Sequence, residues 1–453
     1  MKNDEKNGII GQVQRYDLPT KQKPYRQHAH GGNMSRRLNK NRLNIGVYRL
    51  EKFARTEQHV KDLAAAGVDY VVDVRVNAKN DRPLLDLFEK YGVGAVVGGV
   101  VPGWGYTDDT CGRMHEINTL DRYDAGAASF VDHPAILGIG VGDEPSSLDF
   151  PWYGEVVNRV KQLFPNQFVN LNLFPNYAYR PDDSESAVSN LLGATSYKEY
   201  IEKYCRYVPL DYICYDNYPF VDVPENQKIT RVSVWYENLR IVSDACRRYG
   251  KQLFVVPMVN SGNPGWWTSL NQLRFQAYTS LAFGAETIIW GCYTVGWWWN
   301  AVVDNNGNKT EQYEKLKKVN SELRAIGEEY MRYRCVSTYF VGFDGRRDLE
   351  KVEQGTVDEI NTGTFLNVRA NGGEPLVIGH MVSRTDDSSA LMIAAADDPL
   401  DLSTKTYSVN FRVLEGVQLT ALGGEGKKDV IKNGDGTYSV EIRSNEGVLI
   451  IAK

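Results

Sequence analysis

The chain has 453 residues, a length that exceeds one ordinary hydrophobic core and suits one large domain beside a smaller one. Its 52 basic and 57 acidic side chains are interspersed and give a net charge of −5, so we expect no nucleic-acid partner and no attraction to an anionic membrane. Aromatic residues make up 11% of the chain, and their amphipathic rings suit sugar faces and wet interfaces as well as a large core.

A polar arm over residues 1–42, rich in Lys, Arg, Asn and Gln, precedes the first apolar strand. Its opening, "MKNDEKNGIIGQ", lacks the apolar segment of a signal peptide, but it also fits an exported protein whose leader has been removed. We therefore expect either a cytoplasmic protein or, with a leader removed, a periplasmic or cell-surface one. The sequence contains no run of about 18 apolar residues, which predicts no membrane span.

Residues 43–338 alternate between short apolar strands and helix-like segments. Strands such as "LNIGVYRL" and "VDYVVDVR" are apolar on both faces, as in a parallel sheet covered by helices, and several helices end in Gly before the next strand. Eight such units in succession predict a (β/α)8 barrel, a fold that typically has about 250 residues. The competing open, doubly wound sheet needs a Gly-rich loop after an early strand, and "VYRLEKFART" has no glycine.

Residues 339–453 follow a different period. Short alternating strands such as "GTFLNVRA", "KTYSVNFRV" and "GVLIIAK" are separated by turn sequences such as "NGDG". This pattern predicts a C-terminal antiparallel β-sandwich.

A candidate pocket follows from the predicted barrel, because the reacting groups of such barrels lie where the strands end. It combines carboxylates, amides and indoles, with no histidine in the set. None of the six cysteines of the chain forms a CxxC pair, and we expect buried thiols. We therefore predict no metal, no other cofactor and no thiol nucleophile. The residues assigned to this pocket are Arg49, Glu51, Asp73, Arg75, Trp104, Asp143, Glu144, Asn172, Asn176, Tyr215, Asp216, Tyr218, Asn260, Trp266, Thr294, Trp297, Trp298 and Trp299.

Paired carboxylates beside aromatic rings are suited to glycoside hydrolysis. One acid protonates the departing oxygen, a second group stabilises the developing positive charge, and flat rings stack on the sugar. The predicted partner is therefore a carbohydrate substrate, and the predicted reaction is cleavage of O-glycosidic bonds in an oligo- or polysaccharide. We expect the acid to have a raised pKa, because a second carboxylate lies near it in a partly dry cleft.

The strand order and four motifs resemble the clan A type of barrel glycoside hydrolases. This likeness includes poorly characterised bacterial members that read Asp-Glu-Pro where better known ones read Asn-Glu-Pro. The motifs are Glu144 at the end of the fourth strand, "YDNYPF" at the end of the sixth, "AFGAETIIWGCYT" for the eighth and "VNSELRAIG" in the helix that follows. The resemblance implies a sugar-hydrolysing enzyme with Glu144 as general acid/base.

The seventh strand departs from this resemblance. Clan A enzymes carry a nucleophilic Glu at its end, whereas here "LFVVPMVNSG" offers Asn260 and no carboxylate. Glu286 begins the eighth strand, so we expect it at the opposite, stabilising face of the barrel. The nucleophile is therefore missing from its expected place.

Three interpretations remain open. In the first, Asp216 acts as nucleophile if its carboxyl lies about 5 Å from that of Glu144, or as base for a water at about 6.5–9.5 Å. In the second, which resembles barrel N-acetylhexosaminidases, Asp143 orients a 2-acetamido group whose oxygen attacks, and Tyr215 or Tyr218 binds that oxygen. Because strand neighbours point to opposite faces, Asp143 reaches the pocket only if the strand has turned at Gly142. In the third, the barrel binds glycan without cleaving it.

Structural roles are also open to these residues. Asp143 could cap the next helix or pair with Arg49 or Arg75, and those arginines could serve only as ion-pair partners. Asp216 could be a turn residue before a proline. We expect His133 to be a loop or core histidine rather than a base.

Overall fold

The computed structural model describes residues 38, 41–76, 81–103, 110–179, 191–220, 228–262, 264–294, 299–343, 349–352 and 356–453. Residues 36–453 form one compact unit. Most of the predicted polar arm, together with Trp104, Trp297 and Trp298 of the predicted pocket, lies outside the described residues.

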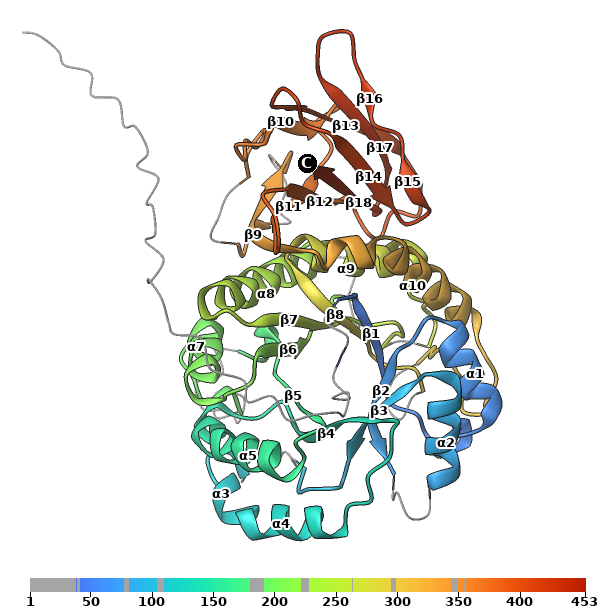
Figure 1. Ribbon diagram of the computed structural model, residues 1–453, viewed down its shortest axis with the longest axis vertical. Coiled ribbons are helices and arrows are strands. Elements are labelled where there is room, and N and C mark those ends of the chain that lie inside the picture. Colours follow the sequence, from blue (N-terminus) through green and yellow to red (C-terminus); the bar gives the residue numbers. More distant parts are fainter. Residues whose placement is uncertain are drawn as a thin grey trace, which may run out of the picture. The chain divides into compact units, whose positions relative to one another are not determined.

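Eight parallel strands form a barrel (Figure 1). Seven neighbouring pairs, including β1 with β8, are joined by parallel ladders, and β5 meets β6 through one parallel bridge from Leu173 to Tyr215. The predicted (β/α)8 barrel is thus confirmed. Its strands are β1 (Asn44–Tyr48), β2 (Tyr70–Arg75), β3 (Gly94–Gly98), β4 (Ile136–Asp143), β5 (Phe168–Asn172), β6 (Tyr212–Asp216), β7 (Gln252–Val256) and β8 (Ala285–Trp290).

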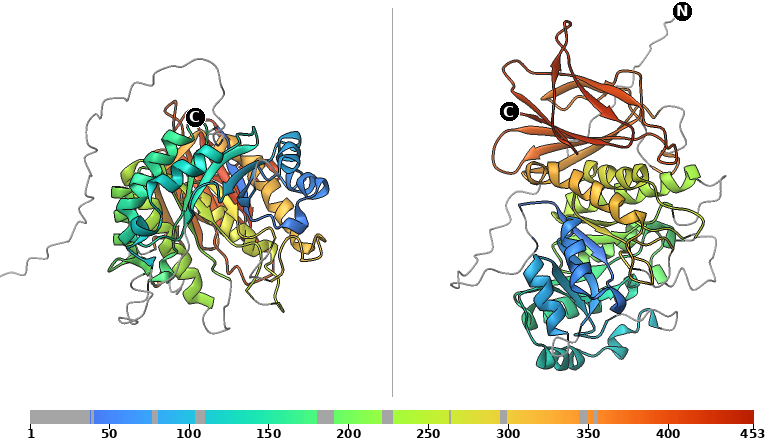
Figure 2. Two further views of the ribbon diagram at one scale, coloured as in Figure 1. Left: turned by 90° about the horizontal axis from the view of Figure 1, so that it is seen from below. Right: turned by 90° about the vertical axis from the view of Figure 1, so that its right-hand side faces the viewer.

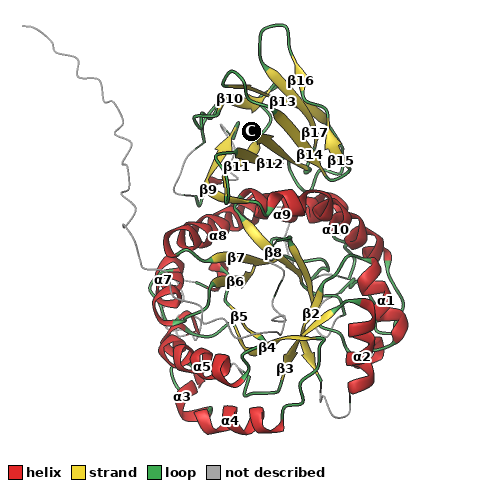
Figure 3. Cartoon of the chain, viewed as in Figure 1, coloured by secondary structure: helices red, strands yellow, loops and turns green. Residues whose placement is uncertain are grey.

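Helices surround this sheet (Figure 3). Their ends carry the expected local signals: Gly92 ends one helix in the left-handed conformation, and Ser269 begins another with a capping box to Gln272. None of the helices in the described part of the chain has the length and apolar character needed to cross a membrane. The α-helices are α1 (Glu57–Ala65), α2 (Arg82–Tyr91), α3 (Met114–Ile117), α4 (Leu120–Ser129), α5 (Phe150–Leu163), α7 (Tyr197–Tyr207), α8 (Lys228–Tyr249), α9 (Leu270–Ala282) and α10 (Glu311–Tyr330).

The C-terminal strands form two antiparallel sheets, in the orders β10-β13-β17-β16 and β15-β14-β18-β12-β11-β9. Side chains such as Phe411 and Val440 of the first and Ile378 and Leu391 of the second share one apolar core, which confirms the predicted β-sandwich. The domain boundary at residue 338 stays a prediction. The strands are β9 (Tyr333–Val341), β10 (Phe365–Ala370), β11 (Leu376–Ser383), β12 (Ser389–Ala395), β13 (Thr406–Val413), β14 (Leu419–Gly423), β15 (Gly426–Lys428), β16 (Ile431–Lys432), β17 (Tyr438–Arg443) and β18 (Gly447–Ala452).

The six-stranded sheet packs directly on α9 and α10 (Figure 2). A Cβ added to Gly379 of β11 would lie 2.2 Å from the carbonyl oxygen of Ala282, and one added to Gly447 would lie 2.2 Å from the ring of Tyr278. Only glycine permits approaches this close. Most of α9 is consequently buried, because the barrel lies on one of its sides and the sandwich on the other.

A buried ion-pair cluster ties the same helices to the sandwich. Arg274 of α9 donates to both carboxylate oxygens of Glu322 on α10, at 2.9 and 2.5 Å, and lies 3.5 Å from Glu446. The Glu322 side chain is 2% exposed, and the hydroxyl of Tyr278 also donates to it at 3.3 Å. Removing one partner from such a cluster leaves the other charge buried and uncompensated.

We expect Glu322→Ala to lower the free energy of unfolding by about 3–5 kcal/mol, because Arg274 would lose its buried partner. The matched control is Glu311→Ala on the same helix, where Glu311 forms an exposed i,i+4 pair with Lys315. That change should cost less than about 1 kcal/mol. Urea unfolding of the three proteins measures both values, and equal losses would contradict the assignment of Glu322 to a buried, stabilising cluster.

Candidate active site

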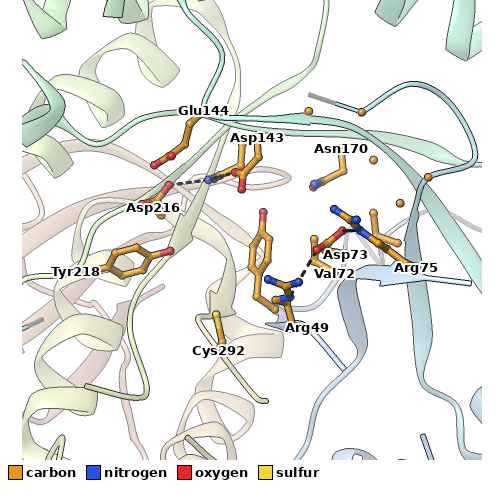
Figure 4. A pocket seen from close by; sticks show the side chains of 18 residues that line it. Arg49, Val72, Asp73, Arg75, Asp143, Glu144, Asn170, Asp216, Tyr218 and Cys292 are labelled. Atoms are coloured by element: carbon orange, nitrogen blue, oxygen red, sulfur yellow. Dashed lines mark hydrogen bonds and ion pairs between the residues drawn. The ribbon is translucent and has the colours of Figure 1, made fainter. Parts of the chain in front are cut away.

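A cavity of about 740 Å³ lies at the C-terminal ends of the barrel strands (Figure 4). Of the predicted site residues, it brings together Arg49, Asp73, Arg75, Asp143, Glu144, Asn172, Asp216 and Tyr218. Its other lining residues are Tyr48, Val72, Val96, Gly98, Gly99, Gly103, Gly140, Gly142, Asn170 and Cys292.

The end of β4 turns two successive carboxylates into this cavity. Its register against β5 shifts by one residue between Gly140 and Gly142, so that the regular alternation of side chains is interrupted before Asp143. Glu144 then adopts the left-handed conformation, with a φ of 49°. The bulge and this turn together allow Asp143 and Glu144 to line one cavity, which a regular strand would not allow.

Two further lining residues share this unusual backbone conformation. Arg49 follows β1 with a φ of 65°, and Asp73 lies near the end of β2 with a φ of 56°. The left-handed region costs a non-glycine residue on the order of 1 kcal/mol and persists only where the surrounding structure imposes it. Such positions gather at functional sites, and here three of them surround one cavity.

Asn172, the last residue of β5, holds the two aspartates. Its side-chain nitrogen donates to Oδ1 of Asp143 at 3.0 Å and to Oδ1 of Asp216 at 2.7 Å. The carboxyl group of Glu144 lies close enough to Asp216 for each to shift the pKa of the other. Three carboxyl groups therefore gather at the ends of β4 and β6, two of them joined through Asn172 (Figure 4).

Burial is the largest cause of raised pKa values in this cluster. It raises the pKa of Asp143 to about 6 and that of Asp216 to about 8, although the hydrogen bonds from Asn172 oppose both shifts. The pKa of Glu144 lies well above its usual range through burial and then through the charges of Asp216 and Asp143, as the sequence led us to expect. The Asp143 side chain is nevertheless exposed to the cavity.

The raised pKa of Asp216 predicts that the free energy of unfolding depends on pH. The folded state keeps this proton up to about pH 8, whereas the unfolded chain loses it near pH 4, so stability falls as the pH rises between these values. Asp216→Asn removes that penalty and still offers an oxygen to Asn172. We expect the variant to be more stable than wild type by about 1–2 kcal/mol at pH 8, with a smaller difference at pH 5. Thermal unfolding of both proteins at pH 5 and pH 8 measures this difference. A stability advantage of the variant over wild type that is smaller at pH 8 than at pH 5 would contradict the raised pKa of Asp216.

The opposite wall of the cavity carries ion pairs. Arg49 Nε lies 3.3 Å from Glu51 and 3.8 Å from Asp73, and Arg75 Nε lies 3.8 Å from Asp73. Both arginines thus have the structural role considered from the sequence and also line the cavity. The Arg75 side chain is 77% exposed, which leaves its remaining donors accessible.

Three predicted binding residues do not reach the cavity. Tyr215 is fully buried on the face of β6 opposite to Cys214 and Asp216, and its hydroxyl has no partner within the described ranges. Asn260 is fully buried, and its Oδ1 accepts from the backbone N–H of Cys292 at 3.2 Å. Trp266 packs against Phe220, with ring centroids 6.5 Å apart.

Other candidates from the sequence have structural partners or lie on the surface. Asn176 donates to Val234 O at 3.0 Å, and the hydroxyl of Thr294 donates to Arg49 O at 3.1 Å. Glu286 pairs with Arg384 of the sandwich at 2.7 Å, at the far end of the barrel as expected. Trp299 is 54% exposed on the segment after β8. The ring of His133 accepts from Ala135 N at 3.1 Å and lies 3.0 Å from Asp86, which fits a structural histidine.

The sequence analysis missed Tyr48, Asn170 and Cys292. Asn170 precedes Asn172 by two positions on β5, so strand periodicity alone places it on the same face. Its side-chain amide has no hydrogen-bond partner in the described part of the chain, the residue is 4% exposed, and the amide points into the cavity (Figure 4). Its donors and acceptor are therefore available to a ligand.

No protein-family model matches this sequence, and no curated protein does. Solved structures of similar fold include a Glycoside Hydrolase Family 5 mannosidase from Rhizomucor miehei, in complex with mannosyl-fructose, at 11% identity and a TM-score of 0.45 over 64% of this chain and 95% of that one. The Clostridial cellulose synthase subunit Z from Clostridioides difficile has 11% identity and a TM-score of 0.41 over 60% of this chain and 98% of that one. These similarities concern the fold of the barrel and carry no argument about the reaction.

Proposed function

We propose that the protein is a glycoside hydrolase that cleaves O-glycosidic bonds of an oligo- or polysaccharide, with Glu144 as general acid/base. The observation that carries this proposal is a proton-holding carboxyl group at the end of β4, beside a second carboxyl group from β6, in a cavity at the C-terminal face. A carboxylic acid that keeps its proton at working pH can give it to the departing glycosidic oxygen.

Asp216 is the candidate second carboxylate. Its carboxyl group lines the same cavity as that of Glu144 and would act as nucleophile or as base for a water once it has lost its proton. Arg75, Asn170 and Tyr218 line the same cavity and offer hydrogen-bonding groups to sugar hydroxyls.

A second candidate is a substrate-assisted N-acetylhexosaminidase that uses Asp143 and Glu144. Two observations favour it: Asp143 is the exposed member of the cluster, and it loses its proton at a lower pH than Asp216 does. An ionised, accessible carboxylate can orient a 2-acetamido group and stabilise the positive charge that forms on it. Tyr218, which lines the same cavity, could then bind the acetamido oxygen.

The test is hydrolysis of a panel of aryl glycosides, with and without a 2-acetamido group, by wild type and by Glu144→Gln. We expect wild type to release the aryl alcohol from at least one member and the variant to lose that activity. If both proteins bind saccharides in calorimetry and hydrolyse none, the result would contradict hydrolysis and support the third interpretation, a glycan-binding barrel.

A further inference from the structure

Every donor of the Asn172 side chain is already used inside the protein. An amide nitrogen carries two hydrogens, and those of Asn172 go to Asp143 at 3.0 Å and to Asp216 at 2.7 Å. The residue is 3% exposed. It therefore has no hydrogen left for a sugar hydroxyl, and the geometry does not support its predicted role as a substrate-binding residue.

Cys214 fixes which way this amide faces. Its thiol lies 3.4 Å from Oδ1 of Asn172 and can donate to it, and Cys214 is fully buried two positions before Asp216 on the same face of β6. When both aspartates are ionised, a flipped amide would place Oδ1 against two carboxylate oxygens and its N–H groups against the thiol. With ionised aspartates, the network of Cys214, Asn172, Asp143 and Asp216 therefore has one favourable arrangement.

We propose that Asn172 is a positioning residue, which holds Asp143 and Asp216 from a single nitrogen and so stabilises negative charge on this pair of aspartates. This inference rests on the proposed function, because it assigns a role within the same site. The two aspartate oxygens lie no farther apart than the sum of the 3.0 and 2.7 Å bonds that join them to this nitrogen, so two charges there would repel strongly without a shared donor.

The groups that face this cluster come from several strands. Glu144 lies beside Asp216, and Arg49 and Asp73 act on Asp143 from β1 and β2. The side chains of Tyr48, Tyr200, Tyr218, Cys214 and Cys292 also face the cluster. Arg49 favours the ionised form of Asp143, whereas Asp73 disfavours it. Asn172 adds a neutral donor that favours ionisation of both aspartates.

The experiment is a carboxyl titration by carbon-13 NMR of aspartate-labelled protein, combined with pH profiles of kcat and KM. Asn172→Ala removes the shared donor and should raise the pKa values of Asp143 and Asp216 by about one pH unit or more. The acid limb of kcat, which reports a required carboxylate, should move to higher pH, while KM changes less than kcat. Asn172→Ser keeps one donor and should give a smaller shift, which provides a second measurement if the alanine variant folds poorly.

Asn170→Ala is the matched control, because Asn170 lies on the same strand face, lines the same cavity and has no hydrogen-bond partner for its side chain among the described residues. It should raise KM and leave the pKa values of Asp143 and Asp216 unchanged. If Asn172→Ala and Asn172→Ser instead raise KM and leave the titration unchanged, Asn172 is a substrate contact and the inference is overturned. The titration needs no turnover. If the protein hydrolyses no glycoside, the proposed function is refuted, but the titration still decides whether Asn172 is a positioning residue.

Discussion

Replacing Glu144 with glutamine should slow hydrolysis of glycosides with poor leaving groups by about 10²–10⁴-fold, because the amide cannot protonate the departing oxygen. The loss should be far smaller for a dinitrophenyl glycoside, whose leaving group departs without a proton. Comparison of kcat/KM over a series of aryl glycosides with leaving groups of different acidity measures this dependence.

The control for this experiment is Glu286→Gln. Glu286 belongs to the same barrel, but it pairs with Arg384 at the end opposite to the cavity, so its replacement should leave hydrolysis unchanged. A Glu144→Gln variant that loses the same factor on every leaving group would contradict a general acid. Such a result would instead indicate that Glu144 acts in binding or as nucleophile.

Asp216→Ala should have the larger effect of the two aspartate replacements if Asp216 supplies the nucleophile. On substrates without a 2-acetamido group we then expect a loss of about 10³-fold or more, against a smaller loss for Asp143→Ala. Proton NMR of the first-formed product adds the stereochemistry: retention indicates a covalent intermediate on Asp216, whereas inversion indicates that Asp216 activates a water.

The substrate-assisted route makes the opposite prediction. Only 2-acetamido sugars would react, Asp143→Ala would be the more damaging change, and a thiazoline analogue of the cyclised intermediate would inhibit strongly. Rates with matched pairs of hexosides and 2-acetamido hexosides distinguish the routes. Hydrolysis of plain hexosides that survives Asp216→Ala undiminished would contradict both of them.

The fold was predictable because its signals are local. Each signal can be read from a few neighbouring residues: strands apolar on both faces, glycines at helix ends, and the change to alternating apolar and polar residues in the C-terminal strands. The position of Glu144 at the end of β4 follows from counting the strand–helix units along the chain. The bulge before Asp143 and the left-handed turn at Glu144 depend on pairing with β5, so the sequence could only name the condition under which Asp143 reaches the cavity.

The errors at the site have different physical origins. Tyr215 was assigned to the pocket together with Asp216, although strand neighbours face opposite ways, and the period-2 rule would have excluded it. Asn260 lies four positions beyond the end of β7, where periodicity no longer predicts direction. The shared hydrogen bonds of Asn172 join residues of three different strands, and no local pattern encodes them.

The burial of α9 between barrel and sandwich has a consequence for synthesis of the chain. The last barrel helix ends at Tyr330, but β11, β12 and β18, which belong to the sheet that covers α9, end at Ser383, Ala395 and Ala452. At about 5–20 residues per second, a ribosome needs roughly 6–24 s to add the missing part. During that interval the nascent barrel exposes the side of α9 that carries Arg274, Tyr278 and Ala282, so we expect a stalled or truncated chain to present an uncovered surface to chaperones.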